Sequence, residues 1–80
     1  MNTTIRRILR EHARLRADVD SIADDADLYK VGMTSHASVN VMLALEAAFD
    51  VEFPDRMLSR QVFGSVATIR AAIEELTTGR

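Results

Sequence analysis

Hydrophobic positions at the start of the chain recur with the spacing of an α-helix. They fall at i, i+3, i+4 and i+7 and therefore share one helical face; the residues are Ile5, Ile8, Leu9 and His12. Arginines fill most of the other positions, as on a helix that is buried along one side only. We therefore predict a first helix over about Thr3–Leu15, capped by a polar side chain; the candidates are Asn2, Thr3 and Thr4.

A second periodic run begins at Ser35 or His36 and ends at Phe49, and it is more apolar than a typical surface helix. Its larger apolar residues are Val39, Met42, Leu43, Leu45 and Phe49. Such a helix can be the central core helix of a bundle, or it can present an apolar surface to a partner. We expect both: an inward stripe in the core and an outer edge, near His36, Asn40 and Leu43, that forms a contact surface.

The rest of the chain predicts two further helices and a long connection. Pro54 interrupts helical structure, and Asp55 is expected to cap a short helix over about Arg56–Gln61. Ser65 is a suitable cap for a last helix over about Val66–Leu76. The connection over 16–30 is expected to be tied to the core by Val19 and Ile22. The predicted fold class is all-α, with three main helices, one short helix and a long loop after the first helix.

Length and composition limit the function classes. The chain has 80 residues, which predicts a single domain over 1–80. It contains no cysteine, so it forms no disulfide and no cysteine metal cluster. No apolar run approaches the ~18 residues of a membrane span, and the N-terminus lacks the apolar core of a signal peptide. We therefore expect a cytoplasmic monomer that has no membrane partner.

Charge is mild overall, at −2, but it is unevenly distributed. The first helix is basic, which could indicate a nucleic-acid surface. We favour a solvated helix face and expect no nucleic-acid partner, because no aromatic residue for base stacking interleaves the arginines. The acidic loop that follows does not match a calcium-binding loop. Counted from Asp18, the fifth, sixth and twelfth positions are Ile22, Ala23 and Tyr29.

The adjacent Ser35 and His36 could suggest a hydrolase. Neighbouring residues in a helix point in different directions, and the glycine-flanked elbow of such enzymes is absent. We therefore expect no catalytic residues, and we interpret His12 as a half-buried residue at the edge of the core. Gly32 lies three residues before Ser35, which predicts a turn that delivers Ser35 to a helix start. There a serine can cap the helix, and a phosphate attached to it is favourably placed.

Three segments around this serine carry a family resemblance. They are Leu45-Glu46-Ala47-Ala48-Phe49, then Val51-Glu52-Phe53-Pro54-Asp55, and the lead-in to Gly32 with Asp25, Leu28 and Val31. The chain resembles the acyl carrier protein family over about Ile5–Leu76. The resemblance implies a four-helix bundle and attachment of 4′-phosphopantetheine to Ser35, whose terminal thiol holds cargo as a thioester. It also implies three partners: a phosphopantetheinyl transferase, an amino acid or acyl ligase that charges the arm, and a downstream acceptor enzyme.

Departures from the family pattern indicate a specialised carrier. Thr34 replaces the usual Asp before the serine, and His36 replaces the usual Leu after it. Acidic residues common on this helix in fatty-acid carriers are also missing; Ala37, Asn40, Ala47 and Ala48 stand in their places. We therefore favour an aminoacyl carrier, with Thr34, His36, Asn40 and Leu43 as partner contacts. The alternatives are a fatty-acyl or polyketide carrier, or a helical adaptor module in which Ser35 is only a cap.

Overall fold

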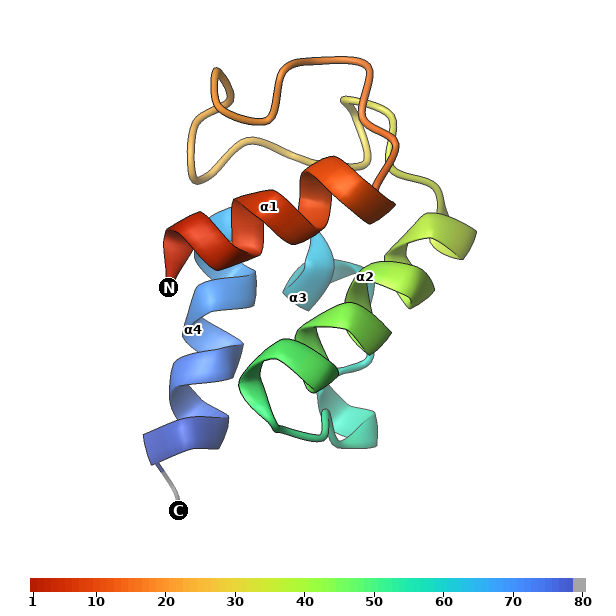
Figure 1. The fold of residues 1–80 in the computed structure, drawn as a ribbon. Coiled ribbons are helices and arrows are strands. Elements are labelled where there is room, and N and C mark those ends of the chain that lie inside the picture. The colour runs from red at the N-terminus through yellow and green to blue at the C-terminus, as the bar shows by residue number, and fades with distance from the viewer. Residues whose placement is uncertain (79–80) are drawn as a thin grey trace.

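The structure is a computed structural model that describes residues 1–78, and in this part of the chain it is helical without strands (Figure 1). The α-helices are α1 (Asn2–His12), α2 (Ser35–Phe49), α3 (Arg60–Phe63) and α4 (Val66–Thr78), with a 3-10 turn η1 (Asp55–Met57) before α3. Three main helices, one short helix and a long loop after the first helix were predicted, and this arrangement is confirmed. None of the helices within residues 1–78 is long and apolar enough to cross a membrane.

Helix α1 buries Ile5, Ile8 and Leu9, as its periodicity predicted. His12 lies at the edge of this stripe and is partly exposed. The helix ends at His12 rather than at Leu15, because Arg14 adopts a left-handed backbone conformation with φ 57°. The predicted side-chain cap is wrong: the N-cap is Met1, and no side chain caps this end. The Asn2 side chain is instead hydrogen-bonded across the bundle, to Asp24 and Arg70.

The loop between α1 and α2 passes over α1 (Figure 1). Several of its residues contact the rest of the bundle. Val19 is buried and Ile22 packs against the core, as expected. The Arg6 guanidinium donates hydrogen bonds to the carbonyls of both residues and to the Asp24 carboxylate. Further along, the buried Leu28 donates its N–H to the Gly64 carbonyl at 2.7 Å. The loop is thereby joined to α1 and to the turn between α3 and α4 before it reaches α2.

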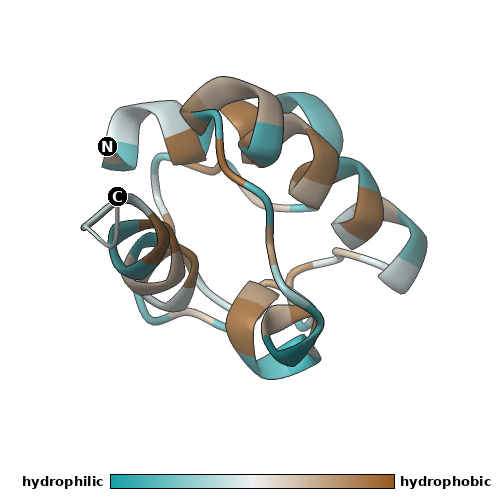
Figure 2. Cartoon of the chain, turned by 90° about the horizontal axis from the view of Figure 1, so that it is seen from below, coloured by the Kyte–Doolittle hydropathy of each residue, from teal (hydrophilic) through white to brown (hydrophobic). Residues whose placement is uncertain are grey.

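The core lies where α1 meets α2 and α4, and where α3 meets α4. Figure 2 shows apolar residues on the side of α4 that faces the other helices. Phe53, which follows α2, packs edge-on against Phe63 of α3, with ring centroids 5.2 Å apart. Edge-to-face packing suits the charge distribution of aromatic rings. This contact holds the segment after α2 against α3.

The predicted helix over Arg56–Gln61 is wrong, because the segment divides into two shorter turns. Met57 is buried at the end of η1, and the chain then leaves helical geometry at Leu58, with φ −84° and ψ 68°. Asp55 does not cap this turn. Helix α3 starts afresh after Ser59, whose hydroxyl accepts a hydrogen bond from the Val62 N–H. The interruption allows both Met57 and Phe63 to enter the core.

The last helix, α4, begins at Val66 as predicted and ends slightly later than predicted. Ser65 caps α4: its hydroxyl accepts from the Thr68 N–H at 3.1 Å, and the Thr68 hydroxyl accepts from the Ser65 N–H. This reciprocal pairing satisfies two backbone donors at the helix start. The helix extends to Thr78 rather than to Leu76.

Candidate functional site at the start of helix α2

Ser35 is the first residue of α2, and its side chain is exposed. The N-cap is Thr34, in an extended backbone conformation, and its hydroxyl oxygen accepts a hydrogen bond from the Ala37 N–H at 3.0 Å. The capping role that Ser35 could have taken therefore belongs to Thr34. Among the described residues, no hydrogen bond involves the Ser35 hydroxyl, so this hydroxyl is available for chemistry.

The approach to Ser35 depends on Gly32, which has φ 119°. L-residues with a side chain rarely adopt this conformation. A Cβ added at Gly32 would also lie 3.2 Å from the backbone nitrogen of Arg16, whose N–H donates to the Val31 carbonyl at 2.8 Å. The predicted turn before Ser35 is thus confirmed, and its backbone conformation favours glycine. Gly32 lets the loop turn sharply and places Ser35 on the surface.

The environment of Ser35 favours negative charge. The first N–H groups of a helix have no partner within the helix, and the helix dipole is positive at this end. Here the Ala37 N–H is taken by Thr34, and the Ser38 N–H by the Thr34 carbonyl. The N–H groups of Ser35 and His36 remain without an intrahelical acceptor. A phosphate on the Ser35 hydroxyl would lie in this favourable field.

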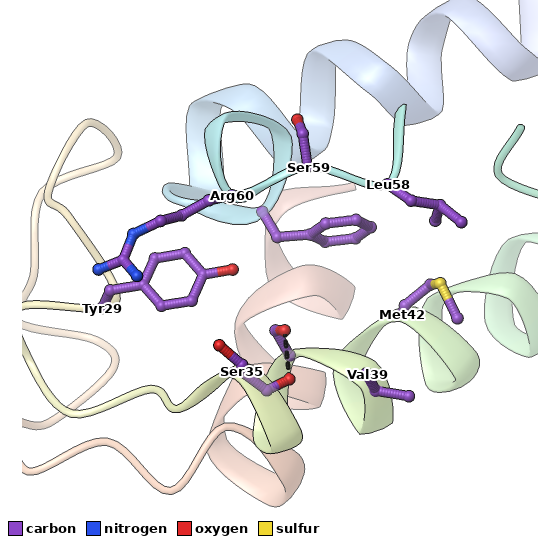
Figure 3. A pocket seen from close by; sticks show the side chains of 9 residues that line it. Tyr29, Ser35, Val39, Met42, Leu58, Ser59 and Arg60 are labelled. Atoms are coloured by element: carbon purple, nitrogen blue, oxygen red, sulfur yellow. Dashed lines mark hydrogen bonds between the residues drawn. The ribbon is translucent and has the colours of Figure 1, made fainter. Parts of the chain in front are cut away.

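A cavity of about 360 Å³ opens beside Ser35, between α2 and the segment that contains α3 (Figure 3). Its lining is mainly apolar and includes hydroxyl-bearing residues and one arginine; the lining residues are Tyr29, Ser35, Ser38, Val39, Met42, Leu58, Ser59, Arg60 and Phe63. Ser38 is turned back toward the helix, because its hydroxyl donates to the Ser35 carbonyl at 2.7 Å. Three serines therefore line this cavity. The Ser59 hydroxyl accepts a hydrogen bond from the Val62 N–H, so only Ser35 has an uncommitted hydroxyl.

The sequence did not reveal that Tyr29 and Arg60 line the same cavity as Ser35. Arg60 belongs to α3, 25 positions further along the chain, and its guanidinium lies over the Tyr29 ring at 4.2 Å from the ring centroid. An arginine over an aromatic face is held by a cation–π interaction. Only the fold brings Tyr29, Ser35 and Arg60 to one cavity, since no motif or periodicity links their positions.

The four predicted contact residues are all exposed. His36, Asn40 and Leu43 follow one another at i, i+4 and i+7 on α2, so they share one face. Leu43 is 54% exposed, whereas Leu45, on the inward side of the same helix, is fully buried. Thr34 precedes this face, and its hydroxyl oxygen is engaged in the cap.

Val39 lies apart from the inward stripe. It was grouped with the apolar face of α2, but it is 50% exposed. Ala37, Val41 and Leu45 form the buried stripe instead. Val39 and Leu43, one helical turn apart, thus leave an apolar strip on the surface that begins near Ser35.

An exposed serine at a helix start, with a phosphate-favouring field and an adjacent cavity, is suited to being modified. A profile of the family described as "Phosphopantetheine attachment site" matches residues 3–76. The chain belongs to this family. It is therefore a carrier protein whose prosthetic group is 4′-phosphopantetheine, and it is not itself an enzyme.

Named relatives of this carrier protein agree with the family assignment. It is 48% identical over 80 residues to the aminoacyl carrier protein of Agrobacterium fabrum, covering all of this chain and 96% of the relative. It is 38% identical over 69 residues to aminoacyl carrier protein 1 of Bradyrhizobium diazoefficiens, covering 86% of this chain and 72% of the relative. The chain is thus homologous to aminoacyl carrier proteins.

A solved structure matches the fold closely. It is a crystal structure of an engineered Bradyrhizobium japonicum glycine:[carrier protein] ligase complexed with a carrier protein from Agrobacterium tumefaciens and AMP. The matched chain has a TM-score of 0.90 and 50% sequence identity, with 92% of this chain and 99% of that chain covered. The acyl-carrier-type fold implied by the sequence resemblance is confirmed.

Proposed function

We propose that Ser35 carries the 4′-phosphopantetheine arm and that residues 1–80 act as a single aminoacyl carrier domain. The observation that carries the proposal is the free, exposed Ser35 hydroxyl at the first position of α2, beside an open cavity. The residues present fit the group, because the hydroxyl is accessible to a transferase and the helix start favours the phosphate. When bound, the arm supplies the terminal thiol that this cysteine-free chain lacks.

The chain's own residues present the serine and expose a docking face. Thr34 fixes the helix start, Gly32 directs the loop, and α2 offers His36, Asn40 and Leu43 toward solvent. We infer that these contacts, with Thr34, meet a phosphopantetheinyl transferase, a charging ligase and a downstream acceptor enzyme in turn. The location proposed for this cycle is the cytoplasm, because the arm comes from coenzyme A and a transferase.

The cargo we propose is an amino acid, and the charging enzyme is an amino acid:[carrier protein] ligase. Two observations support this choice. The relatives are named aminoacyl carrier proteins, and the matched solved structure contains a glycine:[carrier protein] ligase. In addition, Asn40, Ala47 and Ala48 leave the exposed side of α2 without the acidic residues that fatty-acid enzymes read by charge complementarity.

Parallel charging reactions with amino acids and with fatty acids test the proposed cargo. The phosphopantetheine-bearing protein is incubated with ATP and either an amino acid:[carrier protein] ligase with a panel of amino acids, or an acyl ligase with fatty acids. Intact mass then reports which group is attached. We expect an aminoacyl adduct that hydroxylamine removes, as a thioester requires. Efficient charging with fatty acids, and none with any amino acid, would show that the proposed cargo is wrong while leaving the carrier function in place.

A further inference from the structure

We propose that Arg60, held on the ring of Tyr29, is a positioning residue that binds the phosphodiester of the arm and directs the arm into the cavity between α2 and α3. The proposal rests on the proposed function, because it requires the arm to be attached to Ser35. It adds a role for two residues that lie outside the motif around the serine.

The first step is the charge balance of the arginines. Arg6, Arg7, Arg10, Arg56 and Arg70 each have a carboxylate partner within 4.0 Å. Among the described residues, no carboxylate lies within that distance of the guanidinium of Arg14, Arg16 or Arg60. Of these three arginines, Arg60 is the one that lines the cavity beside Ser35. Its close neighbour is the Tyr29 ring, at 4.2 Å from the centroid. Arg60 is thus a cation whose position is set by stacking, while its donors remain available for an anion.

The second step is location. Arg60 and Tyr29 line the same cavity as Ser35. Figure 3 shows the Arg60 guanidinium beside the Tyr29 ring, with the Tyr29 hydroxyl directed into the cavity. The phosphorus of the arm is bonded directly to the serine oxygen, so the phosphodiester lies next to Ser35, which lines this cavity. Within residues 1–78, Arg60 is the only charged residue that lines the cavity, and it has the sign opposite to that of the phosphodiester.

The third step is the chemistry of the pair. A guanidinium presents donors in a planar fork that matches two phosphate oxygens, and it stacks on an aromatic ring through its flat face. Stacking on Tyr29 leaves the edge donors of Arg60 able to bind phosphate. The Tyr29 hydroxyl makes no hydrogen bond to the described residues and can donate to the same group. A lysine would keep the charge but lose both the fork and the stacking.

A competing role for Arg60 is also visible. Asp25 and Asp27 lie with Arg60 around a second hollow, which Tyr29 also lines. If Arg60 served mainly to attract these carboxylates and close the loop, its removal would weaken the protein equally with and without the arm. The two roles therefore differ in whether the effect of Arg60 depends on the arm.

The test is a thermodynamic cycle on the full chain. Wild type, Arg60→Gln and Arg60→Lys are each prepared without and with the arm, and intact mass confirms modification. Urea unfolding then gives the effect of the arm on the folding equilibrium constant. We expect that effect to be about two- to fivefold more stabilising in wild type than in Arg60→Gln, as for an exposed charge pair, and to shrink in 1 M salt. In Arg60→Lys, the stabilising effect of the arm is expected to be intermediate between those in wild type and in Arg60→Gln.

A matched control removes an equal charge nearby. Arg56→Gln alters an arginine four positions earlier that pairs with Glu75 and does not line the cavity. In Arg56→Gln, the effect of the arm on the folding equilibrium constant is expected to equal that in wild type. In wild type itself, the Arg60 Nε–H resonance is expected to shift when the arm is attached, and this observation needs no variant.

The outcomes separate the two proposals. Modification of Ser35, followed by equal effects of Arg60→Gln with and without the arm and an unchanged Nε–H resonance, would overturn the role of Arg60 and leave the carrier function intact. Failure of the transferase to modify Ser35, under conditions that modify another carrier, would overturn the proposed function and this inference with it.

Discussion

The Thr34 hydroxyl oxygen accepts a hydrogen bond from the Ala37 N–H at 3.0 Å, and this bond makes Ser35 the first residue inside α2. In the carrier proteins that this chain resembles, an aspartate usually stands at the position of Thr34. Aspartate and threonine both cap helices through a side-chain oxygen. The departure therefore preserves the local geometry around Ser35 and removes one negative charge beside it.

Replacing the cap tests this relationship. Thr34→Ala removes the oxygen that satisfies the Ala37 N–H, so the free energy of unfolding should fall by about 1 kcal/mol. Thr34→Asp restores a capping oxygen and should retain the stability of wild type. Urea denaturation measures both variants. Equal stability of Thr34→Ala and wild type would contradict a structural role for the Thr34 hydroxyl.

Substitutions of two leucines on α2 should distinguish effects on partner recognition from effects on folding stability. Leu45 is fully buried, so Leu45→Ala should cost about 2–5 kcal/mol of folding stability. Leu43 is 54% exposed, so Leu43→Ala should change stability by less than about 0.5 kcal/mol. If Leu43 contacts the charging ligase, the same variant should lower kcat/KM for aminoacylation by about tenfold, the equivalent of 1.4 kcal/mol. Unchanged kcat/KM would remove Leu43 from the docking face.

Arg6 should stabilise the long loop. Its guanidinium bonds the Val19 and Ile22 carbonyls and the Asp24 carboxylate, and its side chain is 18% exposed. Arg6→Gln should lower the free energy of unfolding by about 1.5–3 kcal/mol, the range for hydrogen bonds to a charged group. It should also speed amide hydrogen exchange in the loop.

Arg7 is the matched control for Arg6, because it lies on the same helix but its side chain is 53% exposed, with Glu11 at 4.0 Å. Arg7→Gln should change stability by less than about 0.5 kcal/mol, since exposed pairs on a helix contribute little. Similar losses in the two variants would mean that the loop contacts of Arg6 are not what stabilises the protein.

Glu46 should hold the exit from α2. Its carboxylate accepts a hydrogen bond from the Phe53 N–H at 2.9 Å, bridging the left-handed residue Asp50 that ends the helix. Glu46→Ala should lower the free energy of unfolding by about 1–3 kcal/mol, because it leaves this N–H without its acceptor. Glu52 is exposed, and Glu52→Ala should be nearly neutral. Thermal unfolding of the two variants measures the difference; equal melting temperatures would contradict the bridging role.

The sequence predicted the parts of the fold that local periodicity controls. The stripes of α1 and α4, the Ser65 cap and the turn at Gly32 all follow from residues close together in the chain. The errors lie where tertiary packing overrides local preference. Asp55 is a good cap by type, yet burial of Met57 and Phe63 divides the segment after it. Asn2 likewise pairs with distant Asp24 and Arg70.

The candidate site shows the same division. Ser35 was found through its motif, and its exposed neighbours on α2 through their helical spacing. The opposite wall of the cavity could not be found this way, because Tyr29 lies in a loop and Arg60 on a helix of one turn. Neither position carries a periodic or motif signal. Only the fold relates them to the serine.

The most direct test of the central claim is the intact mass of the protein after incubation with coenzyme A and a broad-specificity phosphopantetheinyl transferase. Wild type is compared with Ser35→Ala and with Ser38→Ala, which removes the neighbouring hydroxyl that is already bonded to the Ser35 carbonyl. We predict a gain of one phosphopantetheine group in wild type and in Ser38→Ala, and no gain in Ser35→Ala. A gain that survives in Ser35→Ala, or none in wild type, would contradict the assignment of Ser35 as the attachment residue.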